Sequence, residues 1–372
     1  MSAQNWSAKL FSQRTDKGIV PALDGLRAIS ILLVMVGHLQ YQLICADESL
    51  IKNNPALALF FHFAGRADLG VDIFFVISGY IITTRLLRET ARNEHATFSL
   101  KNFYIRRVLR ILPACYTYLI SLFLLSKFFM PLQIVPGKEI LAAGFFVWNF
   151  LPMNNWFLAH TWSLCVEEHF YLLWPPCLKL LKSKGAVYLA LTAIVLAPFG
   201  RLFAYPFAPE HNFYDHLLPG SIDFLMWGAL AAILEGNLTF KQIKAFTFRF
   251  GGHYFAMFYI FVLSAFLASR QTPPAQLAFT LSLLALAIVT FLIYVVEHKE
   301  TLSAKLLNAR PLTHIGVISY SLYLWQQLFI NPQNTSFPFT PLLNFVFAVV
   351  AAELSYHTVE SYFLSLRSKL KA

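Results

Sequence analysis

The sequence predicts an all-α integral membrane protein, a bundle of about ten transmembrane helices with both termini in the cytoplasm. Hydrophobic residues make up 57% of its 372 residues and charged residues only 13%, and the mean hydropathy is +0.57. Soluble globular chains carry about 25% charged residues. A chain so poor in charge cannot cover its surface with polar side chains, so lipid has to cover much of it.

Long apolar stretches are the first evidence for the number of crossings. They begin near Leu26, Leu69, Val108, Glu139, Trp162, Gly185, His216, Phe250, Pro274, Thr313 and Pro338. The fourth, residues 140–151, is shorter than the roughly 18–20 residues that span a hydrocarbon core, so we expect it to be re-entrant or interfacial. The other stretches predict ten crossings.

The positive charge is distributed as a membrane topology requires. If the N-terminus is cytoplasmic, all but six of the 29 lysines and arginines fall in cytoplasmic segments. The six exceptions are Lys52, Arg66, Lys127, Lys138, Arg201 and Arg270. The net charge of +10 therefore reflects topology, and no nucleic-acid partner is expected.

The same distribution predicts the domain organisation. We expect a cytoplasmic N-terminal tail over residues 1–20, one transmembrane domain over 21–363 and a cytoplasmic C-terminal tail over 364–372. The chain is expected in the bacterial cytoplasmic (inner) membrane as a multi-pass protein. The four cysteines have no metal-like spacing, so we expect neither a metal site nor a disulfide framework.

The first apolar helix carries three ionisable residues on one face. Arg27 and His38 are eleven residues apart, about three turns and roughly 16 Å along the axis, and Asp24 lies one turn before Arg27. Ionisable groups in spanning helices are costly and mark functional sites. Anchoring at the cytoplasmic surface also explains Arg27, and a hydrogen-bonded packing histidine also explains His38.

Asp72 opens the second helix near its outer end, where it could orient a histidine or hold a substrate hydroxyl. An interfacial carboxylate is the simpler interpretation. Ser78 and Gly79 follow on the same helix, and such small residues allow close helix packing.

The next segment, residues 85–110, is the most basic part of the chain. Arg107 and Arg110 are three apart in a helical pattern, so both can point the same way. Clustered arginines bind phosphates bidentately, which suits a nucleotide, coenzyme A or an anionic lipid headgroup. Topology alone also explains several of these basic residues.

Glu167 and Glu168 stand together inside an apolar helix, followed by His169. A purely structural helix would not bury three ionisable groups. Because adjacent side chains point about 100° apart, the two glutamates are expected to differ in role. One is predicted to pair with an arginine and the other to face a cavity.

These stretches together resemble the membrane acyltransferase family 3, the bacterial O-acyltransferases that decorate surface polysaccharides, peptidoglycan and secreted glycolipids. The resemblance extends from about Val20 to Tyr362. The motifs that carry it lie at residues 23–38, 70–80, 103–113 and 162–171, with a weaker match at 318–325.

The resemblance implies transfer of an acyl group, expected to be acetyl, from cytoplasmic acyl-CoA to a hydroxyl of an extracytoplasmic glycan. The acceptor would be an O-antigen, an exopolysaccharide or a glycolipid. Acyl-CoA is then a co-substrate, with no tightly bound cofactor. The resemblance assigns donor binding to Arg27, Arg107 and Arg110, with Asp24 beside Arg27.

His38 is implied as the general base or acyl-handling residue, and Glu167 and Glu168 match the family's paired glutamates. We place Asp72 with them as the fourth catalytic candidate. The chain departs from the family pattern at His169, where glutamine is usual, and at Gln326, where histidine is common. It also lacks the usual proline after Glu360. These departures affect the expected acceptor more than the chemistry.

Two other functions also fit intramembrane Asp, Glu, His and Arg. The first is a proton-coupled secondary transporter, although such folds commonly show internal repeats and this chain shows none. The second is a non-enzymatic scaffold of a polysaccharide-assembly complex. No motif identifies the acceptor, the acylated position or the oligomeric state.

Overall fold

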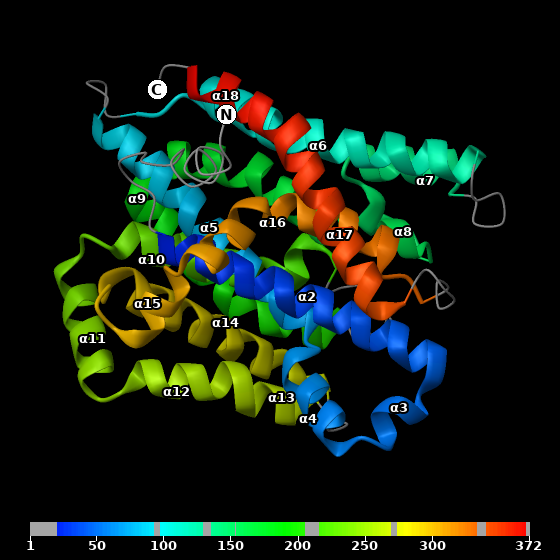
Figure 1. Ribbon diagram of the computed structural model, residues 1–372. Helices are drawn as coiled ribbons and strands as arrows, with labels where there is room; N and C mark the ends of the chain where they lie inside the picture. Colours follow the sequence, from blue (N-terminus) through cyan, green and yellow to red (C-terminus); the bar gives the residue numbers. More distant parts are fainter. Residues whose placement is uncertain are drawn as a thin grey trace, which may run out of the picture.

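The computed structural model describes residues 21–92, 97–128, 135–152, 154–204, 216–268, 274–332 and 340–369, and every regular element in these ranges is a helix (Figure 1). The predicted N-terminal tail, residues 1–20, lies outside the described residues. The longer helices are α2 (Pro21–Asp47), α5 (Ala67–Arg92), α6 (Leu100–Phe128), α9 (Thr161–Ala204), α10 (Leu218–Leu234), α11 (Leu238–Arg249), α14 (Pro274–Glu297), α16 (Arg310–Phe329) and α17 (Pro341–Ser355).

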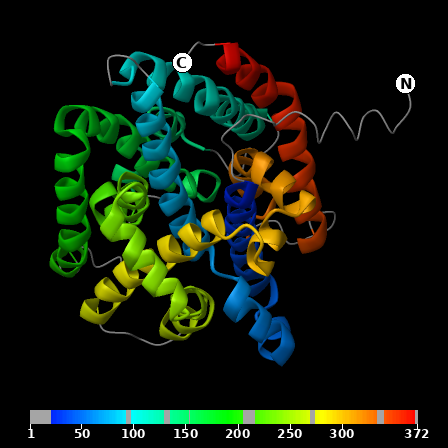
Figure 2. The ribbon, with the colours of Figure 1, turned by 90° about the vertical axis from the view of Figure 1, so that its left-hand side faces the viewer.

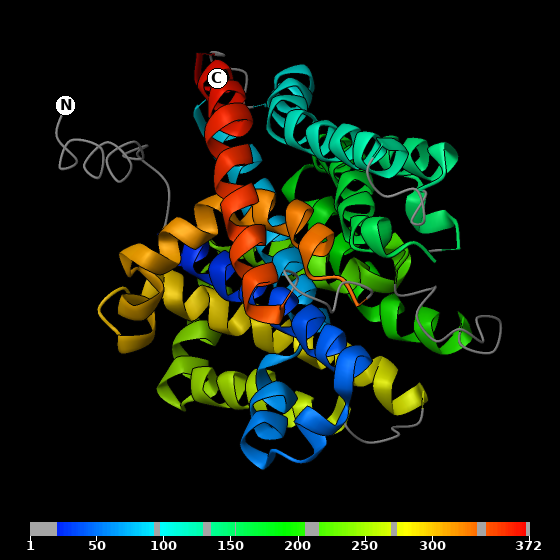
Figure 3. The same ribbon diagram turned by 45° about the vertical axis from the view of Figure 1, so that its right-hand side comes forward.

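Short helices connect or extend the longer ones. They are α3 (Ser49–Lys52), α4 (Pro55–Ala64), α7 (Gly137–Gly144), η1 (Trp148–Phe150), α8 (Trp156–Ala159), α12 (Gly252–Phe258), α13 (Ser264–Ala268), α15 (Leu302–Leu307) and α18 (Ser361–Lys369), with π-helical turns η3 (Tyr259–Leu263) and η4 (Tyr356–Glu360). The last of them, α18, packs against α6 near the C-terminal end of the described chain (Figure 3).

Several of these helices are long enough to span a membrane. Within the described residues, six segments are long and apolar enough to cross a membrane: α2, α4–α5, α6, α8–α9, α14 and α17–α18. Counted as one span, the α10–α11 pair, which is bent by 114°, makes a seventh. An all-α membrane protein is confirmed, whereas ten crossings and cytoplasmic termini stay predictions.

Helix α9 contains two of the predicted crossings. Its 44 residues would extend about 66 Å as one straight helix, twice the thickness of a bilayer core. The backbone leaves helical geometry at Lys182, where φ is 55°, so α9 consists of two arms that point in different directions (Figure 2). The second arm exposes Leu196, Phe199 and Phe203, as a lipid-facing surface requires.

The short fourth apolar stretch forms α7 and η1. Eight residues of α-helix extend about 12 Å, which is too short to cross the hydrocarbon core. This length agrees with the expectation that residues 140–151 do not cross.

Glycines allow the closest helix contacts. A Cβ at Gly79 of α5 would lie 1.9 Å from the Leu225 carbonyl oxygen, and one at Gly228 of α10 would lie 2.1 Å from that of Val76. The two helices therefore touch through their backbones, which confirms the predicted close packing at Gly79.

Helix α16 lies between α2 and α17 and contains the predicted crossing that begins near Thr313, although it is not among the six most apolar spans of the described residues (Figure 1). Its buried residues include Ser319, Ser321, Gln326 and Gln327. Buried polar side chains need hydrogen-bond partners inside the protein, so these residues of α16 are expected to make polar contacts within the bundle.

Candidate functional site

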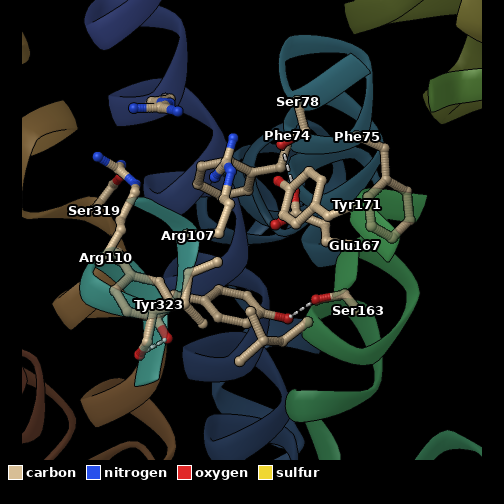
Figure 4. A pocket seen from close by; sticks show the side chains of 14 residues that line it. Phe74, Phe75, Ser78, Arg107, Arg110, Ser163, Glu167, Tyr171, Ser319 and Tyr323 are labelled. Carbon is tan, nitrogen blue, oxygen red and sulfur yellow. Dashed lines mark hydrogen bonds between the residues drawn. The ribbon is translucent and has the colours of Figure 1, made fainter. Parts of the chain in front are cut away.

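A cavity of about 80 Å³ lies where five helices meet, α2, α5, α6, α9 and α16 (Figure 4). Its walls combine arginines, one glutamate, hydroxyl groups and aromatic rings. The lining residues are Arg27, Phe74, Phe75, Ser78, Arg107, Arg110, Ile111, Ser163, Leu164, Glu167, Tyr171, Ser319, Tyr320 and Tyr323. The structure thus brings together four predicted site residues that are up to 140 positions apart in the sequence, Arg27, Arg107, Arg110 and Glu167.

Three of these residues are arginines. The Arg107 guanidinium lies 4.2 Å from the centre of the Tyr171 ring, a cation–π contact that aligns it with the cavity wall. Arg27 pairs with Asp24 across 3.7 Å, which agrees with the prediction that both lie on one face of the helix. Arg85 of α5 interacts electrostatically with all three arginines. Several positive charges in a low-dielectric cleft create a strong attraction for an anion.

The paired glutamates separate as their positions on the helix predicted. Glu167 lines the cavity and accepts a hydrogen bond from the Ser78 hydroxyl over 2.5 Å. Glu168 does not line it, and its Oε1 atom is buried with no hydrogen-bond partner among the described residues. Both carboxylates interact electrostatically with Arg107.

His38 lies outside the cavity wall, and a series of hydrogen bonds leads from the cavity to it. Ser163 and Tyr323 line the cavity, and their hydroxyl oxygens are 2.5 Å apart. The Tyr323 hydroxyl donates to the His160 carbonyl over 2.7 Å. The His160 Nδ1 atom lies 2.6 Å from Gln327 Oε1, and Gln327 Nε2 lies 3.3 Å from His38 Nε2.

The other ring nitrogen of His38 also has a partner on α16. His38 Nδ1 lies 2.8 Å from Gln326 Oε1, so the residue that replaces the family's histidine touches the predicted base directly. The His38 ring packs edge-on against Trp156, with ring centres 5.3 Å apart. Trp156 in turn donates to the carbonyls of Gln327 and Ile330, both at 3.1 Å. Trp156 therefore packs against His38 and is hydrogen-bonded to the end of α16.

Asp72 lies in a different environment. Its electrostatic neighbours are Arg66, Asp68, Arg201 and Asp223. Within the described ranges no hydrogen bond or ion pair connects Asp72 with His38. The structure does not bring these two predicted residues together.

The sequence did not indicate the structural role of Arg201. We counted it as an outward-side basic residue, but it is 6% exposed and pairs with Asp223, which is fully buried. It also donates to the carbonyls of Gly220 and Ala278 at 2.9 Å, and Ser282 donates to Asp223 over 2.6 Å. This group joins α9, α10 and α14.

The two other positions at which the chain departs from the family pattern, His169 and the segment around Glu360, also make hydrogen bonds. His169 Nε2 donates to the Phe146 carbonyl over 3.0 Å and so holds the segment between α7 and η1. Glu360 is buried and accepts a hydrogen bond from Ser321. Of the two, only Glu360 is buried in the interior.

Four residues of this network were not among the predicted site residues: His160, Ser163, Tyr323 and Gln327. One signal in the sequence could have found two of them. Tyr320, Tyr323 and Gln327 recur every three to four residues, which places them along one face of α16. No comparable pattern indicates His160 or Ser163.

A second hollow of about 810 Å³ lies among α10, α11, α12 and α14. Basic and aromatic side chains line it, among them Lys241, Arg249, His253 and Tyr294. It contains none of the predicted site residues, so the arginine-lined cavity remains the candidate site.

The chain also matches a protein-family model. The family model described as an acyltransferase domain matches residues 20–353. The chain therefore belongs to this membrane acyltransferase family, the one its motifs resemble.

Individual relatives are distant but similar over almost the whole chain. The chain is 28% identical to the peptidoglycan O-acetyltransferase OatA of Listeria monocytogenes, covering 94% of this chain and 56% of that protein. It is also 28% identical to a putative O-acetyltransferase of Staphylococcus aureus and to the putative peptidoglycan O-acetyltransferase YrhL of Bacillus subtilis, covering 95% and 92% of this chain. It spans 59% and 54% of those two proteins. No solved structure matches the chain.

Proposed function

We propose that this protein transfers an acyl group, acetyl by preference, from acyl-CoA to a hydroxyl of an extracytoplasmic glycan. One observation carries the proposal: a cavity with three arginines is linked by hydrogen bonds to a histidine on the same helix as one of them. The relatives named as peptidoglycan O-acetyltransferases support acetyl as the group and a glycan as the acceptor.

In this proposal the arginines receive the phosphates of coenzyme A. Arg107 and Arg110 supply planar guanidinium groups that bind phosphate bidentately, and Asp24 orients Arg27. The flexible pantetheine arm separates the phosphates from the thioester, so the anion site and the base do not need to be adjacent. The basic end of the bundle then faces the cytoplasm of a bacterium, and the protein lies in its inner membrane.

His38 acts as the general base. Its Nε2 lone pair takes the proton of the acceptor hydroxyl while that oxygen forms a bond to the acyl carbonyl carbon. The carbon–sulfur bond breaks, and the proton passes from His38 to the departing thiolate. The products are the acyl ester and free coenzyme A.

The carboxylates have different assignments. Glu167 lines the cavity with Arg107 and balances part of its charge, whereas Glu168, which does not line the cavity, contributes a second electrostatic interaction with Arg107. We assign Asp72 to hydroxyls of the acceptor other than the reacting one, since its environment is separate from that of His38.

Reconstituted vesicles test this function. Labelled acetyl-CoA is supplied at the basic face and a glycan acceptor, such as peptidoglycan fragments, at the other face. We expect labelled ester on the acceptor with the native protein and none with His38→Ala. His62→Ala, a histidine on α4 away from the cavity lining, serves as the control.

Two results contradict the proposal. Full transfer by His38→Ala would remove the base that it requires. Uptake of intact acceptor without ester formation would indicate the secondary transporter instead.

A further inference from the structure

Two adjacent glutamines of α16 hold both ring nitrogens of His38. Gln326 Oε1 lies 2.8 Å from Nδ1, and Gln327 Nε2 lies 3.3 Å from Nε2. Neighbouring side chains on a helix point about 100° apart, so the imidazole ring fits between them. Both glutamines are buried, with exposed fractions of 0% and 2%.

A backbone group decides which way these amides are oriented. The His160 backbone N–H, which can only donate, lies 3.1 Å from Gln327 Oε1. The carbonyl end of Gln327 must therefore face His160, and its NH2 end must face His38. Because that NH2 group is a donor, His38 Nε2 has to be the acceptor and carries no proton.

The rest of the ring follows from this constraint. A neutral imidazole with a bare Nε2 carries its proton on Nδ1, and the oxygen of Gln326 is there to accept it. If the Gln326 amide were flipped, its NH2 group would face the N–H group at Nδ1, and two donors would oppose each other. One backbone N–H thus determines three side-chain orientations in succession.

We propose that Gln326 and Gln327 are positioning residues that keep His38 in the tautomer with a proton on Nδ1 and a free electron pair on Nε2. The inference rests on the proposed function, in which His38 Nε2 is the base. An amide does not titrate in the physiological range, so the arrangement persists over the working pH range. The long Gln327 contact is weak, and the acceptor hydroxyl replaces it when it binds.

The surroundings keep the two glutamines in place. Trp156 donates to the Gln327 backbone carbonyl, and Gln42, one turn after His38 on α2, donates to the Asn331 carbonyl over 3.0 Å. These bonds connect the end of α16 to α8 and α2. Among the described residues, the other titratable groups that join this set of contacts are His160, which contacts Gln327, and Tyr41, which stacks on Trp156.

The same substitution at neighbouring positions tests the inference. Gln326→Glu keeps an oxygen acceptor at Nδ1, so it should retain at least a third of the native kcat. The acid limb of its pH–rate profile should move to higher pH, because a carboxylate stabilises the imidazolium. Gln327→Glu puts an acceptor against Nε2, which favours a proton on that nitrogen, and kcat should fall at least tenfold with KM for acetyl-CoA unchanged.

Two further variants separate positioning from packing. Gln326→Met keeps the size but removes the acceptor, so we expect about a tenfold loss in kcat, the value of one lost hydrogen bond. Asn149→Leu is the matched control, a buried amide whose side chain donates to the His216 carbonyl and does not contact His38 or either glutamine, and it should keep native kcat. Thermal unfolding in detergent checks that each variant is folded.

Contrary outcomes have distinct meanings. If Gln326→Glu and Gln327→Glu lose activity equally, or if Gln326→Met is better than Gln326→Glu, the glutamines serve packing and the inference is wrong. If His38→Ala itself retains full transfer, the proposed function fails before the glutamines are considered.

Discussion

The Ser78 hydroxyl lies 2.5 Å from Glu167 Oε1, so α5 donates a hydrogen bond to α9 in the wall of the arginine-lined cavity. The bond fixes one carboxylate oxygen of Glu167 against α5. It also predicts that the two residues act as a pair, whereas Glu168 has no such hydrogen bond among the described residues.

A double-mutant cycle measures this coupling. Glu167→Gln should lower kcat/KM for acetyl transfer at least a hundredfold, since it removes the only carboxylate that lines the cavity among the described residues. Ser78→Ala alone should lower it about tenfold, the value of one hydrogen bond. In the Glu167→Gln background Ser78→Ala should have little further effect, because interacting residues are not additive. Additive losses would contradict the pairing.

Arg107 should determine affinity for the donor. Lysine keeps the charge but can neither bind phosphate bidentately nor stack on Tyr171, so Arg107→Lys should raise KM for acetyl-CoA about tenfold or more. Arg106→Lys is the control, because Arg106 pairs with Glu89 at 2.5 Å and does not line the cavity. Steady-state kinetics in vesicles compare the two, and equal KM values would disprove the donor assignment.

The α5–α10 contact should tolerate no side chain at Gly79. A Cβ there would meet backbone atoms of Leu225, which cannot move aside, so Gly79→Val should greatly reduce folded protein. Gly137→Val is the control, since a Cβ at Gly137 meets no atom within 4 Å. Size-exclusion chromatography of detergent extracts measures both. A monodisperse Gly79→Val protein at native yield would rule out the close contact.

The buried Arg201–Asp223 pair should stabilise the fold only while both of its charges are present. Asp223→Ala leaves a buried arginine unpaired and should lower the free energy of unfolding by about 3–5 kcal/mol. Asp68→Ala breaks the pair with Arg66, in which the Asp68 side chain is 63% exposed, and should change it by about 0–1 kcal/mol. Thermal unfolding compares the two variants. If Asp223→Ala lowers the free energy of unfolding as little as Asp68→Ala does, Arg201 finds another partner.

Local pattern was enough to predict much of this protein. The scarcity of charge predicted a membrane protein, and helical spacing predicted the Asp24–Arg27 pair, the common direction of Arg107 and Arg110, and the different positions of Glu167 and Glu168. These relationships depend on residues at most a few turns apart, so the helical repeat alone determines them. The motifs also identified the acyltransferase family correctly.

Only the tertiary structure decided what surrounds His38 and where Asp72 belongs. His38 and Gln326 are 288 positions apart, and the apolar stretch that predicted α16 does not show that Gln326 and Gln327 meet His38. Asp72 was grouped with His38 because both are ionisable residues in apolar helices, yet its neighbours are Arg66 and Arg201. The sequence by itself determined which faces of which helices are polar. Which of those faces meet depends on backbone contacts such as those of Gly79 and Gly228, and these arise only when the whole bundle packs.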